Sequence, residues 1–324
     1  MYIRQNLRWS IIWRKSWQSV LFLTLYNTVV CAVFASGFTQ ITIPWQPVAT
    51  LGTAVAFYIG FKNNGSYDRF WEGRQIWGGI VNASRTWAIQ ALEYITSRVD
   101  APDLLHEMPA ATAAELTVRH RRLLYRHIAW CNALRLELRR QRAECWDTDV
   151  APFLSEEESA FMRLRANPPT HLLRRQAAEL RVLREERGLL NDFQHLALMQ
   201  TLDQLFVLQG GCERIKNTPF PRQFAFYSFV FVCLFALLLP LGLLREFDQL
   251  GHYMVWLTVP FATLVAWVFN TIESVGHTSE NPFENQMNDV PMTALCRTVE
   301  IDLREMLGET ELPPPIRPIK DVLY

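Results

Sequence analysis

The stretch FYIGFKNNGSYDRFW, from Phe57 to Trp71, decides how the rest of the chain is interpreted. It begins with apolar residues that suit the interior of a lipid bilayer. From Lys62 onward it becomes polar and charged, although aromatic residues continue through it. This pattern indicates a helix that leaves a membrane and continues into water.

Long runs without any charged residue surround this stretch. No Asp, Glu, Lys or Arg occurs from Ser16 to Phe61, and two helical spans of about 20 residues each fit into that run. A loop is predicted at Ser36–Pro47, which contains two prolines and several polar residues. Two further uncharged runs are Gln223–Leu244 and Gly251–Ile272, separated by a short turn. The sequence therefore predicts an all-α membrane protein with four transmembrane helices in two hairpins; buried hairpins of a soluble protein are the alternative.

The charge distribution predicts the orientation. The chain has 32 basic and 32 acidic residues, so its zero net charge gives no reason to expect nucleic acid as a partner. The segment 62–222 carries 23 of the basic residues, and four more precede Ser16. Because Lys and Arg accumulate in cytoplasmic segments that flank spans, both termini and the middle segment are predicted to be cytoplasmic.

The predicted organisation has four parts. They are an N-terminal segment with two membrane helices (1–61, spans about 20–35 and 48–61), a cytoplasmic helical region (62–222), a second membrane hairpin (223–272, spans about 223–244 and 252–272), and a cytoplasmic belt segment, helix and proline-rich tail (273–324).

The cytoplasmic region has helix signals throughout. Apolar residues from Leu116 to Leu138 repeat at three-and-four spacing, and the arginines between them are interpreted as a solvated helix face. Ser155 and Glu158 have capping-box spacing and predict a short helix. Thr170 is predicted to cap the next helix, which runs to about Arg187, and a further long helix starts at NDFQH.

No motif for catalysis or for a cofactor was found. The sequence contains no G-x-S-x-G, P-loop or G-x-G-x-x-G motif, and no histidine lies in a metal-binding pattern. The cysteines form no C-x-x-C pair and are interpreted as small buried hydrophobes. The sequence therefore predicts no enzyme, no cofactor and no metal site. The six cysteines are Cys31, Cys131, Cys145, Cys212, Cys233 and Cys296.

Two neighbouring stripes lie on the helix that precedes Lys62. One stripe is Gly52, Ala56 and Gly60, whose small size would let another helix approach closely. The other, rotated by about 100°, is Thr53, Phe57 and Phe61. One face can therefore pack while the adjacent face presents aromatic side chains. The residues alone favour phenylalanines that face lipid or core, because an apolar helix carries no sign of a pore; lining of open space is the alternative.

Three motifs, GFKNNGSYDRFWEGRQIWG, GGCERIKNTPFP and SENPFENQMNDVPM, occur in this order and resemble the bacterial branch of the bestrophin family. The resemblance runs from about Trp9 to Leu307. It implies a homopentameric ion channel of the bacterial inner membrane, with one central pore. Matched residue by residue, it implies a pore neck at Thr53, Phe57 and Phe61, and a cytoplasmic constriction at Phe193. It also implies that the SYDRFW segment packs subunit against subunit.

The sequence departs from the family pattern at two places. Relatives often carry an aliphatic residue where Thr53 stands, so we expect a wetter first ring and a hydrophobic neck two rings deep. Animal members follow the NPF motif with an acidic run that binds calcium. Here only Glu284 and Asp289 are acidic, so we predict no calcium clasp and interpret the NPF segment as a structural belt around the neck.

The resemblance implies passive passage of small inorganic ions, with chloride as the ion. A sodium or potassium channel of the same fold and a non-conducting membrane scaffold remain open alternatives. A secondary transporter is supported only by Pro240 and Pro260, since the spans contain no charged residue. The expected partners are further copies of the chain, the permeating ions and the lipid bilayer. Whether the proline-rich tail is ordered or wraps a neighbouring subunit stays open.

Overall fold

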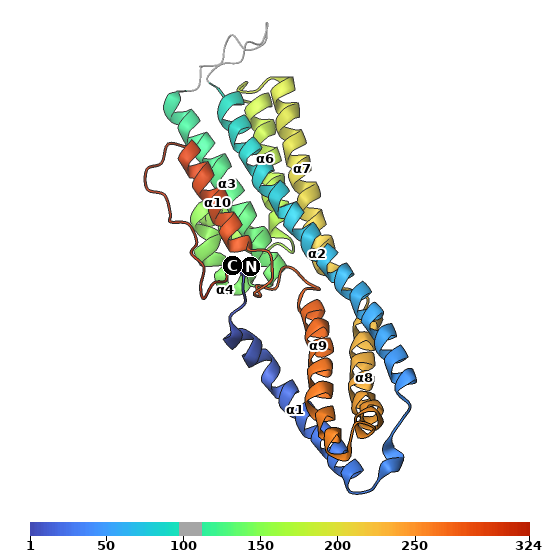
Figure 1. Ribbon diagram of the computed structural model, residues 1–324. Helices are drawn as coiled ribbons and strands as arrows, with labels where there is room; N and C mark the ends of the chain where they lie inside the picture. Colours follow the sequence, from blue (N-terminus) through green and yellow to red (C-terminus); the bar gives the residue numbers. More distant parts are fainter. Residues whose placement is uncertain (97–111) are drawn as a thin grey trace. The chain divides into compact units, whose positions relative to one another are not determined.

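The computed structural model describes residues 1–96 and 112–324. Within these residues the chain is helical, as predicted, and its only β-structure is two isolated bridges. Residues 97–111 of the predicted helical region lie outside the described residues. The elements, shown in Figure 1, are α1 (Trp9–Ala35), η1 (Thr39–Ile41), α2 (Trp45–Tyr94), α3 (Ala113–Arg139), α4 (Arg142–Asp149), η2 (Ala151–Phe153), α5 (Glu156–Arg163), α6 (Pro168–Glu185), α7 (Asp192–Asn217), α8 (Arg222–Asp248), η3 (His252–Leu257), α9 (Thr258–Thr278) and α10 (Met292–Met306).

The chain forms two compact units. The apolar unit consists of Arg4–Phe70 and Pro219–Asn281, and so contains α1, the first part of α2, α8 and α9. The polar unit consists of Met1–Ile3, Trp71–Thr218 and Pro282–Tyr324. The boundary falls within α2, which is a single helix of 50 residues.

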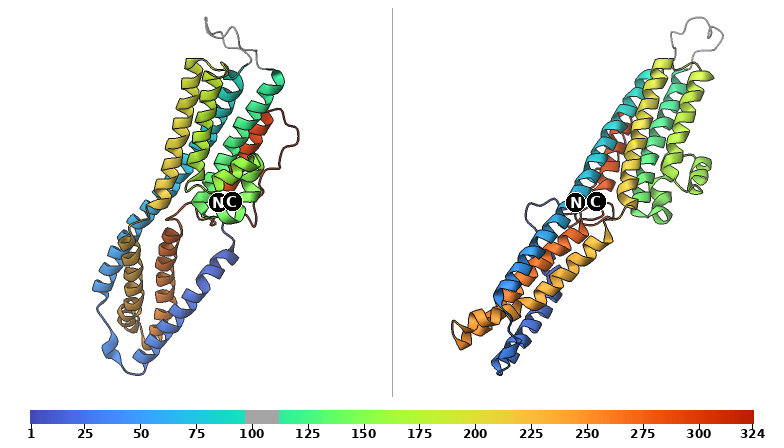
Figure 2. Two further views of the ribbon diagram at one scale, coloured as in Figure 1. Left: turned by 180° about the vertical axis from the view of Figure 1, so that it is seen from behind. Right: turned by 90° about the vertical axis from the view of Figure 1, so that its right-hand side faces the viewer.

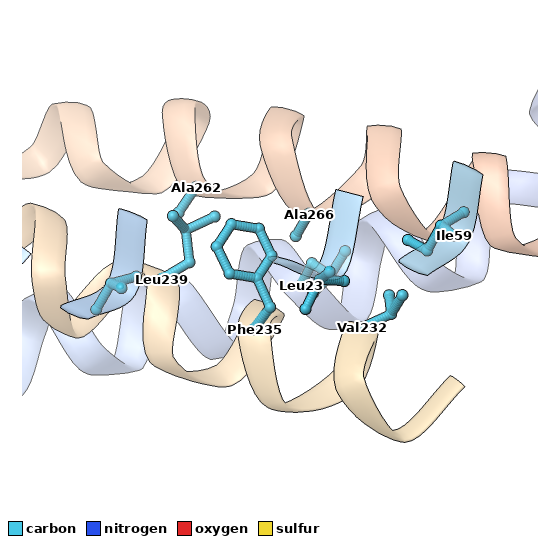
Figure 3. Close-up of a cluster of buried hydrophobic side chains, with 9 residues drawn as sticks. Leu23, Ile59, Val232, Phe235, Leu239, Ala262 and Ala266 are labelled. Carbon is cyan, nitrogen blue, oxygen red and sulfur yellow. The ribbon is translucent and has the colours of Figure 1, made fainter. Parts of the chain in front are cut away.

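The four helices of the apolar unit share one hydrophobic core. Figure 3 shows Leu23 of α1, Phe235 of α8 and Ala266 of α9 gathered in this core. A buried hydrogen bond also joins α1 to α9, because the side-chain amide of Asn27 donates to the Thr263 hydroxyl at 3.0 Å. The core explains why these helices stay together although most of their apolar surface points outward.

Three helices are long and apolar enough to cross a membrane: Trp9–Ala35, Arg222–Asp248 and Tyr253–Thr278. The range 48–61, predicted as a further span, forms part of α2 and is not among them. Its apolar segment is short and runs directly into Lys62 and Asn63, which lowers the hydropathy of any window of span length.

Helix α3 lies in the interior of the polar unit and packs against α4, α6 and α10. The prediction of a solvated arginine face is wrong for its second half, where Arg126 is only 1% exposed. The Arg126 guanidinium donates to Glu158 at 2.6 Å and to Glu179 at 2.7 Å. Carboxylates on neighbouring helices thus neutralise the cation, which allows a basic helix to be buried.

Polar side chains begin the surrounding helices. The Ser155 hydroxyl accepts from the backbone N–H of Glu158 at 3.2 Å, so the predicted start of α5 is confirmed. The predicted cap of α6 is wrong: Asn167 is the N-cap and accepts from the backbone N–H of Thr170 at 3.1 Å. The Thr170 hydroxyl instead accepts from Gln209 of α7 at 2.8 Å.

The proline-rich tail returns to its own chain within the polar unit. Tyr2 and Val322 form an antiparallel bridge, and both chain ends lie side by side in Figure 2. The carbonyl of Tyr324 accepts from the backbone N–H of Ala294 at 2.8 Å, in the first turn of α10. The tail therefore satisfies one of the donors that the start of a helix leaves free.

All six cysteines are free thiols. Four of them are buried, as predicted. Cys145 and Cys233 are only half-buried, so the prediction of burial is wrong for these two.

Candidate pore-lining residues

Thr53, Phe57 and Phe61 all lie on one exposed face of α2, within the apolar unit. The Phe57 side chain is 67% exposed and that of Phe61 is 76% exposed, which is high for phenylalanine in an apolar segment. The Thr53 hydroxyl donates to the carbonyl of Ala49 at 3.0 Å, one turn earlier in the same helix. Its proton is thus held by the backbone, and only its oxygen lone pairs and methyl group remain for the open side.

The opposite face of α2 fixes this orientation. Val55 and Ile59 are each only 2% exposed and belong to the shared core. The predicted small-residue stripe is only partly a packing surface. Gly52 is buried, and a Cβ at this position would lie 2.7 Å from the ring of Phe235, whereas Gly60 has nothing within 4 Å. Positions four apart drift by about 40° around a helix, so the stripe turns away from the core before it reaches Gly60.

Directly after Phe61, the chain buries a cation that sequence reasoning missed. The Lys62 ammonium is fully buried and lies 2.6 Å from a carboxylate oxygen of Glu273 and 3.8 Å from one of Glu280. The sequence nevertheless contains a pattern that could have predicted this ion pair. Lys62 is the first charged residue after one uncharged run, and Glu273 is the first after another.

Two further contacts hold this part of α2 to α9 and the segment that follows it. The side-chain amide of Asn63 donates to the carbonyl of Ile272 at 3.0 Å. The Arg69 guanidinium donates to the carbonyl of Glu280 at 2.9 Å. With the Lys62 ion pair, they hold Asn63 and Arg69 of this stretch to the rest of the apolar unit, whereas the buried Ser66 hydroxyl has no hydrogen-bond partner among the described residues.

Phe193 lies in the first turn of α7, in the polar unit, and is 84% exposed. A capping box positions it: the Asn191 side chain accepts from the backbone N–H of Gln194 at 2.8 Å, and the Gln194 side chain accepts from that of Asn191 at 3.1 Å. Nearby, burial and the Arg184 cation lower the pKa of His195. The structure therefore presents Phe193 on a well-defined helix start, in a different unit from the other three candidates.

The segment after the NPF motif uses its two acidic residues for contacts within the polar unit. Glu284 accepts from the Lys216 ammonium at 2.7 Å. Asp289 is 2% exposed, accepts from the backbone N–H of Gln286 at 2.9 Å, and has its pKa raised by burial. Among the described residues, no group of three or more His, Cys, Asp or Glu side chains could hold a metal ion. The lack of a calcium clasp stays a prediction.

Comparisons with a family model, with known sequences and with solved structures agree on one protein family. A family model described as "Bacterial/Fungal Bestrophin protein" matches residues 5–305. The "Voltage-dependent anion channel-forming protein YneE" of Escherichia coli K12 is 31% identical over 274 residues, which cover 84% of this chain and 80% of the relative. The protein of the same name from Salmonella typhi is 27% identical and covers 97% of this chain and 96% of the relative. A crystal structure of a bacterial bestrophin homologue from Klebsiella pneumoniae aligns with a TM-score of 0.76 at 28% identity, over 90% of this chain and 98% of that one.

Proposed function

The chain belongs to the bacterial and fungal branch of the bestrophin family, and from this premise we propose that it forms a homopentameric anion channel. Chloride is the proposed ion, and its passage is passive. Each subunit contributes four membrane spans, the second being the range 48–61 of α2. The assembly lies in the bacterial inner membrane with both termini in the cytoplasm. We expect no enzymatic activity.

One observation carries the proposal. A single chain leaves Phe57 and Phe61 more than half exposed on the same helix face, while the opposite face is buried in the shared core. Five copies around an axis would arrange these side chains as stacked rings. A narrow apolar ring can exclude water and so gate ions by dewetting. Thr53 supplies a more polar ring at the beginning of the stack, and Phe193 forms a second constriction on the cytoplasmic side.

The sign of the ion depends on how the rings are oriented. Aromatic edges are partly positive and favour anions, whereas ring faces favour cations. The relatives named as anion channels support the first arrangement. A sodium or potassium channel of the same fold is the second candidate.

Purified protein in a planar bilayer with asymmetric NaCl tests the proposal. We expect unitary currents whose reversal potential lies towards the chloride equilibrium potential. A reversal potential on the sodium side would assign the protein to the cation-selective alternative. The absence of current over a range of voltages and salt concentrations would indicate a non-conducting scaffold. Saturable ion uptake without unitary current steps would indicate a transporter.

The variant Phe57→Ala tests the pore lining. Removal of a ring from the narrow neck admits water, so we expect a severalfold rise in single-channel conductance or open probability. Phe226→Ala is the matched control, because Phe226 is a similarly exposed phenylalanine (62%) on α8. Equal currents from wild type and Phe57→Ala would place Phe57 away from the ion pathway.

A further inference from the structure

An apolar groove lies between α1, α8 and α9 in the apolar unit. Its volume is about 500 Å³, within the range of roughly 300–1,000 Å³ that is usual for ligand pockets. Figure 3 shows that Leu23, Val232 and Ala266, which line it, also belong to the shared core. The lining residues other than the polar ones are Phe22, Leu23, Val232, Cys233, Ala236, Leu237 and Ala266.

One end of this groove is polar. Gln18 and Ser19 of α1 and Asn270 of α9 line it together with the apolar residues. The antiparallel pairing that joins Asn27 to Thr263 places Ser19 level with Asn270, two helical turns away. In the part of the chain that the structure describes, no side-chain hydrogen bond engages Gln18, Ser19 or Asn270. The groove thus has three free polar groups at one end and hydrocarbon along the rest.

Two cations lie just beyond the polar end. Arg14 and Lys15 are exposed residues of α1, and positions three and four apart share a helix face. Lys15 therefore lies one turn before Gln18 and Ser19 on the same side. No acidic residue occurs in the sequence before Asp68, so no carboxylate of α1 or of the start of α2 neutralises these cations.

Tryptophans mark the same level of α1. Trp13 is 67% exposed and Trp17 is 44% exposed. Tryptophan is enriched where a membrane protein crosses the headgroup region, because its ring is apolar and its N–H is polar. Along α1, Trp13 and Trp17 therefore flank the two cations, and the polar groove residues and then the hydrocarbon lining follow, which matches the order from headgroup to acyl chain in a phospholipid.

We propose that the groove binds one acyl chain of an anionic phospholipid, whose phosphate contacts Arg14 and Lys15. Gln18, Ser19 and Asn270 then face the ester and glycerol oxygens. The inference goes beyond ion conduction and rests only on the proposed placement of α1 in the membrane, with its start on the cytoplasmic side. Its test measures bound lipid directly, so that a non-conducting protein could still satisfy it.

Native mass spectrometry of the delipidated full-length protein provides the test. Phosphatidylglycerol and phosphatidylcholine with identical acyl chains are titrated separately. We expect one tightly held phosphatidylglycerol per subunit and weaker binding of phosphatidylcholine. One basic residue near a lipid surface changes binding by about fivefold, so Arg14→Gln with Lys15→Gln should weaken phosphatidylglycerol binding by about 25-fold. Phosphatidylcholine binding should change little.

Three further variants separate the groove from the charge. Ala236→Phe adds a ring inside the groove and should reduce the binding of both lipids. Phe22→Ala removes a wall residue that is 64% exposed, so it should also weaken both lipids without disturbing the fold. Arg245→Gln, which removes an exposed cation from the opposite end of α8, is the control and should leave binding unchanged.

Several results would overturn the proposal. Equal affinities for the two lipids, or unchanged phosphatidylglycerol binding in the Arg14 and Lys15 variant, would show that these cations do not bind the lipid phosphate. Unchanged binding in both Ala236→Phe and Phe22→Ala would place the lipid elsewhere. An image of the assembly with a neighbouring subunit seated in the groove would assign it to the subunit interface.

Discussion

At the scale of a residue, His127 shows how the polar unit handles a titratable group. It is fully buried on α3, between the rings of Trp87 and Trp130. One ring nitrogen, Nε2, lies 2.8 Å from the Ser84 hydroxyl, and the other, Nδ1, is buried with no hydrogen-bond partner among the described residues. Burial lowers the pKa of His127 to about 3. At pH values between about 3 and 6.5, the His127 imidazole therefore stays neutral in the folded chain but is protonated in the unfolded chain.

The sign of the pH dependence follows from this difference. An unfolded histidine titrates near 6.5, so below that pH the unfolded state binds a proton that the folded state does not. Stability is therefore full near neutral pH and falls as the pH drops from about 6.5 towards 3. Between about pH 7 and pH 5 the loss amounts to about 2 kcal/mol.

His127→Gln tests this effect, because glutamine keeps a polar group opposite Ser84 but does not titrate. Thermal melts in detergent at the two pH values should show a smaller acid-induced fall in melting temperature for the variant than for wild type. Parallel falls in both proteins would mean that acid destabilisation originates elsewhere.

At the scale of an element, close packing of α2 against α7 distinguishes the two glycines in GGCERI. A Cβ at Gly211 would lie 2.9 Å from Cδ1 of Ile76 in α2, which is closer than a carbon contact permits. At Gly210, next in the chain, nothing lies within 4 Å. A side chain of the neighbouring helix thus limits the space at Gly211, whereas Gly210 faces open space.

The two glycines form a matched pair of variants. Gly210→Ala should be neutral or stabilise by up to about 1 kcal/mol, because alanine favours helix. Gly211→Ala gains the same propensity but overpacks the contact, so it should be about 1–3 kcal/mol less stable than Gly210→Ala. Ile76→Val removes the obstructing Cδ1 atom and should restore part of the loss. Equal melting temperatures for the two alanine variants would contradict the close approach.

The sequence predicted the positions of the helices better than the contacts between them. Uncharged runs and polar caps located α1, α8 and α9 and the starts of α5 and α7, because these signals are local. The burial of Arg126 was not predicted, since its partners Glu158 and Glu179 lie on helices far along the chain. The cap of α6 was misassigned because Asn167 and Thr170 both favour helix starts, and only the contact with α7 distinguishes them.

For the candidate pore residues, too, the sequence predicted what depends on local spacing but not what depends on the fold or on assembly. A face of Thr53, Phe57 and Phe61 follows from helical spacing alone, and the structure leaves both phenylalanines largely exposed. Their assignment to a pore rests on the family resemblance and on an assembly of several chains. A single chain does not show that assembly. The Lys62–Glu273 ion pair needed the fold, because two uncharged runs must first be brought side by side.

At the scale of the whole molecule, the exposed apolar residues favour an assembly. Large aromatic side chains point outward from α2 and α7, among them Phe57, Phe61 and Phe193. Lipid can cover such rings only within the bilayer. Phe193 lies in the polar unit and is 84% exposed in a single chain, so contact with other copies of the chain would reduce its exposure to water.

The purified assembly should therefore have five times the 37.7 kDa mass of one chain. Native mass spectrometry after detergent removal measures this directly. Phe57→Ala should keep the same number of subunits, since we assign Phe57 to the pathway rather than to the contacts between subunits. A predominant single-chain species in wild type would exclude a shared central pore.

In the proposed channel, the buried pairing of Lys62 with Glu273 would also limit how a passing ion is selected. If Phe61 lines the pathway as we propose, an anion that has passed it would meet no uncompensated positive charge at the next residue, because Lys62 is already paired with a carboxylate. Attraction of chloride at this level must then come from weaker sources, such as the edges of aromatic rings. Discrimination between anions would follow how readily each ion sheds its hydration water, with large, weakly hydrated anions passing most easily.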